Sequence, residues 1–239
     1  DTGPRVKVFS NSAAYFLNPA GIDWSIASDL TVINADVDAQ GLLDRVVVGD
    51  LGGNLWRFDM AGNDATAWKG KRLAILSDPG VPNRKILFPP TIVPQKDPFP
   101  APWDAVYVGT GDREHPLVTP SSDKMFMVVD RDTGITARNE PAASFVAGDF
   151  LPLAVSETSG VVPSALTSKR GWVRDLEPGE KVTGAPFVFN QRLRFGTYNP
   201  TAVTSACLPP GEGRLNEVDA LFGSLVELAE WDTFCNARD

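Results

Sequence analysis

A repeated pattern of short apolar runs constrains the fold of this chain more than any other feature of its sequence. Each of three segments has a β-branched or aromatic run ending in glycine, then a second apolar run ending in aspartate with another glycine soon after. Two such runs joined by a turn are typical of a β-hairpin. The glycines that end the first runs are Gly49, Gly109 and Gly196, and the second runs begin at Leu55, Met125 and Leu215.

A further short apolar run precedes each hairpin, at residues 30–33, 90–93 and 186–189, and a fourth run at 71–76 follows the first hairpin. Three or four antiparallel strands per unit, repeated along the chain, are typical of propeller blades. We therefore predict an all-β fold: a modified, quinoprotein-like β-propeller, or the C-terminal part of one, with long inserted loops. The predicted units are residues 27–80, 86–150 and 170–230, within one propeller portion that spans 1–239.

The number of units predicts that this portion is incomplete. Three blades cannot close a ring, because propellers usually have about 4–8 blades. The turn at Asp1–Gly3 also matches the blade-ending turn at Asp132–Gly134. We expect further blades upstream of Asp1 to be partners of these three units. An open stack of sheets with capped edges is the alternative.

An acidic turn occurs in the first unit alone, between its first two strands. Oxygen-bearing side chains fall at positions 1, 3, 5 and 9 of this turn, and Gly41 at position 6 allows a sharp bend. Ca²⁺ takes about 6–8 oxygen ligands, which such a curled turn can supply. The sequence predicts a Ca²⁺ site whose ligands are Asp36, Asp38, Gln40, the backbone carbonyl of Leu42, and Asp44.

The turn is not an EF-hand, since Val47 stands where the twelfth-position glutamate would be and no helical pattern flanks it. Its small number of carboxylates predicts weak affinity, on the order of 10⁻⁴ M, as in extracellular modules. The alternative is a solvated acidic β-turn that binds nothing. Asn34 and Asp50 flank the turn and are interpreted as turn or blade residues.

Composition excludes several classes of function. The net charge is −8 without an obvious basic patch, which argues against a nucleic-acid partner. The sequence has no run of 18 apolar residues, so it predicts no transmembrane segment. The single histidine, His115, is expected in a surface loop, and we find no nucleophile elbow and no zinc-ligand spacing. Among the tryptophans, we expect Trp56 to lie in the core and Trp103 to be exposed.

Residues 36–59, 106–111 and 169–207 resemble the C-terminal propeller of the PilC/PilY family of type IV pilus-associated proteins. This resemblance implies a secreted protein of the cell surface, outer membrane or pilus tip. It also implies roles in pilus assembly, retraction control, twitching motility and surface adhesion. Its partners would be pilus subunits or minor pilins and a receptor on a host or abiotic surface. The family's turn would bind Ca²⁺, although Gln40 stands where such turns usually have Asp or Asn.

The two cysteines, Cys207 and Cys235, could form a disulfide or remain free thiols. The secreted setting that the resemblance implies favours the disulfide. The leading interpretation of the whole chain is a noncatalytic module. A quinoprotein-like propeller dehydrogenase and a purely structural repeat scaffold are the alternatives.

Overall fold

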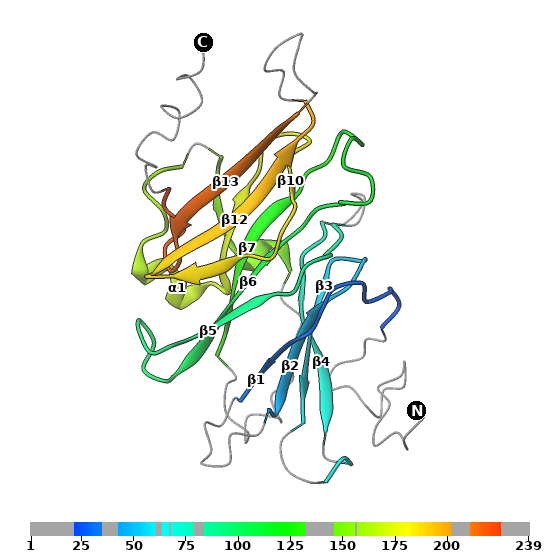
Figure 1. The fold of residues 1–239 in the computed structure, drawn as a ribbon. Coiled ribbons are helices and arrows are strands. Elements are labelled where there is room, and N and C mark those ends of the chain that lie inside the picture. Colours follow the sequence, from blue (N-terminus) through cyan, green and yellow to red (C-terminus); the bar gives the residue numbers. More distant parts are fainter. Residues whose placement is uncertain are drawn as a thin grey trace.

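Three consecutive β-sheets, each built mainly from antiparallel strands, make up the computed structural model of this protein (Figure 1). It describes residues 22–34, 43–60, 64–66, 68–78, 84–131, 146–155, 157–201 and 211–225. The all-β fold class predicted from the sequence is confirmed. Within the described residues, no helix has the length and apolar character needed to cross a membrane.

The first sheet is a four-stranded meander in which neighbouring strands follow one another along the chain. It contains β1 (Thr31–Ile33), β2 (Arg45–Gly49), β3 (Asn54–Asp59) and β4 (Lys69–Ile75), in that order. The hairpin predicted between β2 and β3 is confirmed, with Gly49 opposite Leu55. Its turn includes Gly53, whose φ of 77° lies in the left-handed region that glycine adopts without steric cost.

The second sheet has five strands in the order β5-β6-β7-β9-β8. Its strands are β5 (Thr91–Gln95), β6 (Trp103–Gly109), β7 (Lys124–Asp130), β8 (Leu151–Leu153) and β9 (Gly171–Asp175). The β8–β9 pair is parallel, whereas the other pairs are antiparallel. A 3-10 helix at Ala147–Asp149 and the short helix α1 (Pro163–Ser168) lie in the connection between β7 and β9.

The predicted boundary between the second and third units is wrong at β9. The sequence placed residues 171–175 in the third unit, but β9 pairs with β7 and completes the second sheet. Gly171 makes this pairing possible, because a Cβ atom there would lie 1.8 Å from the carbonyl oxygen of Met127. The strand was misplaced because a connection of forty residues separates it from its partner in the sequence.

The third sheet contains β10 (Lys181–Val182), β11 (Phe187–Phe189), β12 (Arg192–Asn199) and β13 (Glu212–Asp219). Both β10 and β11 pair with one edge of β12, and β13 pairs with the other edge. Asn190 and Gln191 connect β11 to β12 with φ angles of 51° and 59°. Positive φ at both central residues is the signature of the two-residue turn that matches the twist of a hairpin.

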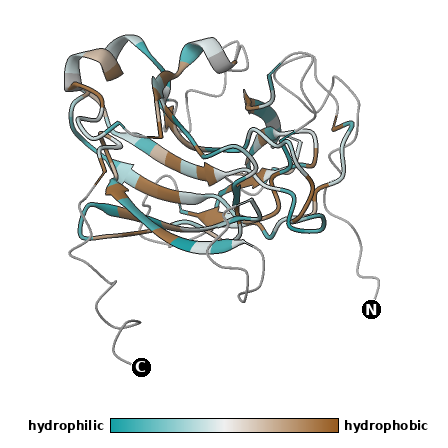
Figure 2. Cartoon of the chain, turned by 90° about the horizontal axis from the view of Figure 1, so that it is seen from above, coloured by the Kyte–Doolittle hydropathy of each residue, from teal (hydrophilic) through white to brown (hydrophobic). Residues whose placement is uncertain are grey.

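Apolar side chains fill the two joints between consecutive sheets. The hydrophobic segments of the cartoon lie mainly on the strands in the centre of the molecule (brown in Figure 2). Between the first and second sheets the buried set includes Val47, Leu55, Ile86, Val106, Val108, Phe126 and Val128. Between the second and third it includes Tyr107, Met125, Met127, Trp172, Val182, Leu193, Phe195 and Val218.

The two tryptophan predictions had different outcomes. Trp56 is fully buried on β3, as expected. Trp103 was predicted to be exposed, but it is only 1% exposed, so that prediction is wrong. Its ring meets the edge of Phe99 with centroids 5.1 Å apart, and its Nε1 donates a hydrogen bond to the carbonyl of Asp97. The proline-rich stretch around Trp103 therefore folds over the indole instead of presenting it to solvent.

Candidate functional site

Asp44 is the one predicted Ca²⁺ ligand that falls within the described residues. Asp36, Asp38, Gln40 and Leu42 lie outside them. Asp44 directly precedes β2, and its backbone N–H donates to the carbonyl of Ile33 at 3.1 Å. Its own carbonyl accepts a hydrogen bond from the N–H of Met60 at 2.6 Å. Asp44 is thus held between the end of β1 and the end of β3, and its side chain is buried.

A network of buried charges begins at the next residue. Arg45 donates through Nε to Asp59 at 2.8 Å and through Nη1 to Asp104 of the second sheet at 3.1 Å. Arg57 donates through Nη1 to Asp130 of the second sheet at 2.6 Å, and its Nη2 lies 3.0 Å from Asp59. Two arginines of the first sheet therefore reach two aspartates of the second.

The same burial acts differently on the two aspartates of the second sheet. Burial raises the pKa of Asp104 above its usual value, and the nearby Arg45 offsets this only in part. Burial would also raise the pKa of Asp130, but the positive charges of Arg57, Lys71 and Arg45 hold it below its usual value. Asp130 is therefore the more firmly ionised carboxylate of the pair.

Asp50 flanks the predicted Ca²⁺ turn in the sequence, and the structure gives it a different role. Its carboxylate accepts hydrogen bonds from the backbone N–H groups of Gly52 and Asn54, both at 2.9 Å. It also accepts bonds from the side-chain amide of Asn54 and from Nε1 of Trp56 at 2.8 Å. With its oxygens used in this way, Asp50 stabilises the β2–β3 turn, which agrees with the interpretation of Asp50 as a turn or blade residue.

A second group of potential ligands lies in the loop after β6. Asp112, Glu114 and His115 have ligand atoms within 4.8 Å of one another. The ammonium group of Lys85 already lies among these side chains, since its Nζ is 2.7 Å from Asp112 and 3.7 Å from Glu114. The side chain of His115 is 62% exposed, which agrees with its prediction as a surface loop residue. An ammonium group among the carboxylates reduces the attraction for a metal ion, so this cluster serves as a control for the acidic turn.

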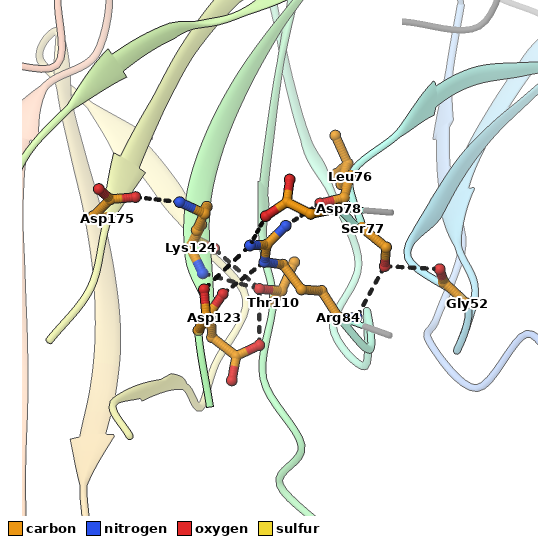
Figure 3. A network of polar contacts seen from close by, with 10 residues as sticks. Gly52, Leu76, Ser77, Asp78, Arg84, Thr110, Asp123, Lys124 and Asp175 are labelled. Carbon is orange, nitrogen blue, oxygen red and sulfur yellow. Dashed lines mark hydrogen bonds and ion pairs between the residues drawn. The ribbon is translucent and has the colours of Figure 1, made fainter. Parts of the chain in front are cut away.

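An open depression of about 570 Å³ lies where β7 begins and where β8 and β9 end. Its lining includes Ser121, Ser122, Asp123, Lys124 and Asp175. Figure 3 shows part of this lining beside the contacts of Arg84, which donates to the carbonyls of Leu76 and Ser122 and pairs with Asp78. Lys124 is paired with Asp175. Burial raises the pKa of Asp123, whose carboxylate accepts a hydrogen bond from the hydroxyl of Thr110.

Comparison with known proteins identifies two relatives of the chain. It is 28% identical over 228 residues to the protein described as "Type IV pilus biogenesis factor PilY1 homolog" from Xylella fastidiosa. The crystal structure of the Pseudomonas aeruginosa PilY1 C-terminal domain matches its fold with a TM-score of 0.59. The chain is similar to PilY1 proteins. No family model matches it.

The two similarities differ in what they cover. The alignment to the Xylella PilY1 homolog includes 86% of this chain but 15% of that protein. The match to the Pseudomonas PilY1 domain includes 82% of this chain and 47% of that domain, at 18% sequence identity, so it bears on the fold alone. Together they confirm the predicted resemblance to the PilC/PilY family and the propeller-type, all-β fold class.

Proposed function

We propose that this chain is a noncatalytic, Ca²⁺-binding propeller module of a type IV pilus-associated protein. The observation that carries the proposal is the sequence similarity to a type IV pilus biogenesis factor. The protein acts in pilus assembly and retraction control, twitching motility and surface adhesion. It is secreted and resides at the cell surface, outer membrane or pilus tip. Its partners are pilus subunits or minor pilins and a receptor on a host or abiotic surface.

The position of Asp44 supports a regulatory role for the cation. Asp44 is followed directly by Arg45, which forms ion pairs with Asp59 of its own sheet and Asp104 of the next. A cation held at Asp44 therefore acts one residue away from the charges that join two sheets. Because buried ion pairs are sensitive to nearby charge, Ca²⁺ shifts the stability of this joint. The ion thereby couples the calcium concentration to the rigidity of the module.

Titration calorimetry with CaCl₂ tests the site. The wild-type chain is compared with Asp36→Ala, Asp38→Ala and Asp44→Ala variants, and with Asp112→Ala as a matched control from the lysine-filled cluster. We expect the wild type and the control to bind Ca²⁺ with a dissociation constant on the order of 10⁻⁴ M. The three turn variants lose this binding. Equal heats from all five proteins would contradict the site.

Thermal unfolding provides a second measurement that does not depend on the heat of binding. A ligand at about 100 times its dissociation constant stabilises the folded state by about 2.7 kcal/mol. Ca²⁺ in this excess therefore raises the unfolding temperature of the wild type, and Mg²⁺ at the same concentration raises it less. Asp36→Ala is the most informative variant, because Asp44 is buried and its removal also affects packing.

The pilus role is tested separately with purified minor pilins. The chain is immobilised, and binding is measured with Ca²⁺ and with a chelator. We expect binding that weakens in the chelator and in the Asp36→Ala variant. Failure of every pilin to bind would contradict the partner assignment and leave the calorimetric result intact. Dye reduction after reconstitution with a quinone would contradict the noncatalytic assignment.

A further inference from the structure

The depression at the strand ends of the second sheet has the size of a small-ligand site. Its volume of about 570 Å³ lies within the range of about 300–1,000 Å³ that is usual for ligand pockets. The second sheet packs against the first sheet on one face and against the third on the other. The depression opens at the ends of its strands, where Lys124 begins β7 and Asp175 ends β9. It therefore belongs to the sheet whose two neighbours both lie within the described residues.

Hydrogen bonds from two buried arginines fix the walls of the depression. Arg174 donates to the carbonyls of Ala154 and Val155, at 3.0 and 3.2 Å. Arg84 donates through Nε to the carbonyl of Ser122 at 2.6 Å and through Nη2 to its hydroxyl at 3.2 Å. Both arginines are 3% exposed, so they hold these segments from the interior of the protein. A site that is formed in advance loses little conformational entropy when a ligand binds.

The exposed charges of the lining compensate one another. Lys124 and Asp175 lie directly opposite each other on β7 and β9 and form an ion pair, and their side chains are 20% and 46% exposed (Figure 3). An ammonium group beside a carboxylate offers a hydrogen-bond donor and an acceptor to the same ligand. Because the two charges cancel, the pair has little net attraction for an ion. A neutral ligand that both donates and accepts fits it better.

The other carboxyl group of the lining belongs to Asp123, which is 7% exposed. It accepts a hydrogen bond from the hydroxyl of Thr110 at 3.0 Å (Figure 3). Burial raises the pKa of Asp123, although the positive charges of Lys181 and Arg84 oppose this effect. Burial thus weakens the preference of this carboxyl for its charged form. Asp123 therefore gives the depression no strong preference for a cation.

Apolar side chains form the other part of the lining, and they come from the segments after β8 and β9. They are Ala154, Val155, Leu176 and Pro178. Val155 is 40% exposed although its side chain is apolar. Sugar rings combine apolar C–H groups with hydroxyls that both donate and accept hydrogen bonds. The lining offers a partner to each of these two kinds of group.

A peptide strand is a poorer match for this place in the fold. Peptides that bind to sheets add a strand along an exposed edge through backbone hydrogen bonds. The depression lies at the ends of strands, beside Lys124, Leu153 and Asp175, and does not follow an edge. Its position therefore favours a compact ligand.

We propose that this depression binds a neutral mono- or disaccharide. The sugar hydroxyls form hydrogen bonds with Ser122, Lys124 and Asp175, and the C–H groups pack on Val155 and Leu176. The inference rests on the geometry of the second sheet and does not depend on the acidic turn or on the pilus role. Because the depression is open, the dissociation constant is on the order of 10⁻³ M, as for a small ligand with few contacts.

Saturation-transfer NMR with a panel of small ligands tests this proposal. The neutral sugars are glucose, galactose, mannose, N-acetylglucosamine and lactose. Protonated glucosamine and glucuronate are the charged analogues, and a capped tri-serine peptide is the neutral ligand without a sugar ring. A chelator is present throughout, so the outcome is independent of Ca²⁺ binding. We expect magnetisation transfer to at least one neutral sugar, and titration of that sugar to show tighter binding than that of the charged analogues and the peptide.

Variants place the binding in the depression. Ala154→Tyr fills it without removing a hydrogen bond, because Arg174 binds the backbone carbonyl of Ala154. We expect this variant to bind the sugar at least about tenfold more weakly. Ala101→Tyr is the matched control, since Ala101 is also exposed but lies between β5 and β6, outside the lining. It binds like the wild type, and circular dichroism checks that both variants are folded.

Ser122→Ala provides a second variant that changes the packing little. It removes one hydroxyl and keeps the backbone carbonyl that Arg84 holds. We expect binding to weaken by about 2–10-fold, which corresponds to one hydrogen bond. The proposal is overturned if no neutral sugar receives magnetisation, or if a charged analogue or the peptide binds more tightly than every neutral sugar. Equal binding by the wild type, Ala154→Tyr and Ser122→Ala would also overturn it.

Discussion

The two internal joints share one geometry but differ in chemistry. Between the first and second sheets, buried arginines and aspartates supplement the apolar contacts, with Arg45, Arg57 and Asp130 each no more than 2% exposed. Between the second and third sheets, the facing residues are apolar, among them Met127 and Leu193. In both joints a glycine of one sheet, Gly49 or Gly109, receives an apolar side chain that leads into the next sheet, Ile86 or Val182, and the chemistry of the other facing residues differs.

The apolar joint also contains polar contacts, which connect the second sheet to the turn after β13. Tyr107 and Trp172 of the second sheet donate to the carbonyls of Ala220 and Leu221 in the turn after β13. Arg174 donates to the carbonyl of Gly223 at 2.6 Å. These bonds go to backbone acceptors. The charged joint, in contrast, depends on side-chain partners for each of its ions, so it should respond more strongly to the loss of any one of them.

The largest effect is expected from removing one charge of the first joint. Arg57→Met keeps most of the side-chain volume but removes the guanidinium that pairs with the buried Asp130 and leaves Asp59 with Arg45. Breaking a buried ion pair from one side costs about 3–5 kcal/mol. We expect the free energy of unfolding, measured by urea titration and tryptophan fluorescence, to fall by this amount.

Arg194→Met provides the control for this loss. Arg194 pairs with Glu217 on the face of the third sheet opposite to the buried Leu193 and Phe195, and both paired side chains retain contact with solvent. Partly exposed pairs contribute about 0–1 kcal/mol. Equal losses in the two variants would show that the buried network adds nothing beyond an ordinary surface pair, and the contrast between the joints would not hold.

A somewhat smaller effect is expected in the apolar joint. Leu193→Ala removes a fully buried side chain from the core between the second and third sheets. A cavity of this kind costs about 2–5 kcal/mol, depending on how far the surroundings relax. Leu215→Ala, on the exposed side of the same sheet, should cost much less. If both variants unfold at the same urea concentration, the third sheet is not packed on the second as described.

The smallest effect concerns pH, and it is specific to the charged joint. The pKa of Asp130 is held below its usual value of 3.8, despite burial, by Arg57, Lys71 and Arg45. A depressed carboxyl pKa stabilises the fold above the unfolded value, and this contribution is lost as the pH falls through the folded value. The raised pKa of Asp104 acts in the opposite direction.

Unfolding of the wild type and of Asp130→Asn is therefore compared from pH 6 down to the acid transition. Below pH 3.8, the ordinary pKa of an aspartate, we expect the free energy of unfolding of the wild type to fall more steeply with decreasing pH than that of Asp130→Asn. The variant has no carboxylate at this position that could take up a proton. Leu193→Ala keeps the wild-type slope, since it leaves the charges unchanged. Parallel profiles for all three proteins would assign the acid sensitivity to other carboxyls.

Local patterning predicted most strands and the tight turns. The runs ending in Gly49 and Gly109 are the strands β2 and β6, and the run ending in Gly196 is the first part of β12, which continues to Asn199. Each pairs with the second run that the sequence indicated. These features depend on alternation and on turn residues a few positions apart, which a single sequence displays directly. The similarity of Asp36–Asp44 to a cation-binding loop is visible for the same reason, and Ca²⁺ binding there stays a prediction.

Long-range pairing was harder to predict. Arg45 and Arg57 are buried in strands of the first sheet, and two of the aspartates that pair with them, Asp104 and Asp130, belong to another sheet. Trp103 follows a run of prolines that suggested an exposed loop, yet Phe99 of that same run covers it. In each case the deciding partner lies outside the local periodicity, and no sequence signal links the two.

The pairing of β9 with β7 also has a consequence for the order in which the chain can fold. The β2–β3 and β3–β4 pairs of the first sheet join strands that are close in the sequence, so that sheet can be complete once residue 75 has been synthesised. The second sheet cannot gain β9 before residue 175, because forty residues separate that strand from β7. Long loops close more slowly than short ones. During synthesis, one edge of β7 therefore stays unpaired until β9 has been made. An unpaired edge of this kind can pair with a wrong strand.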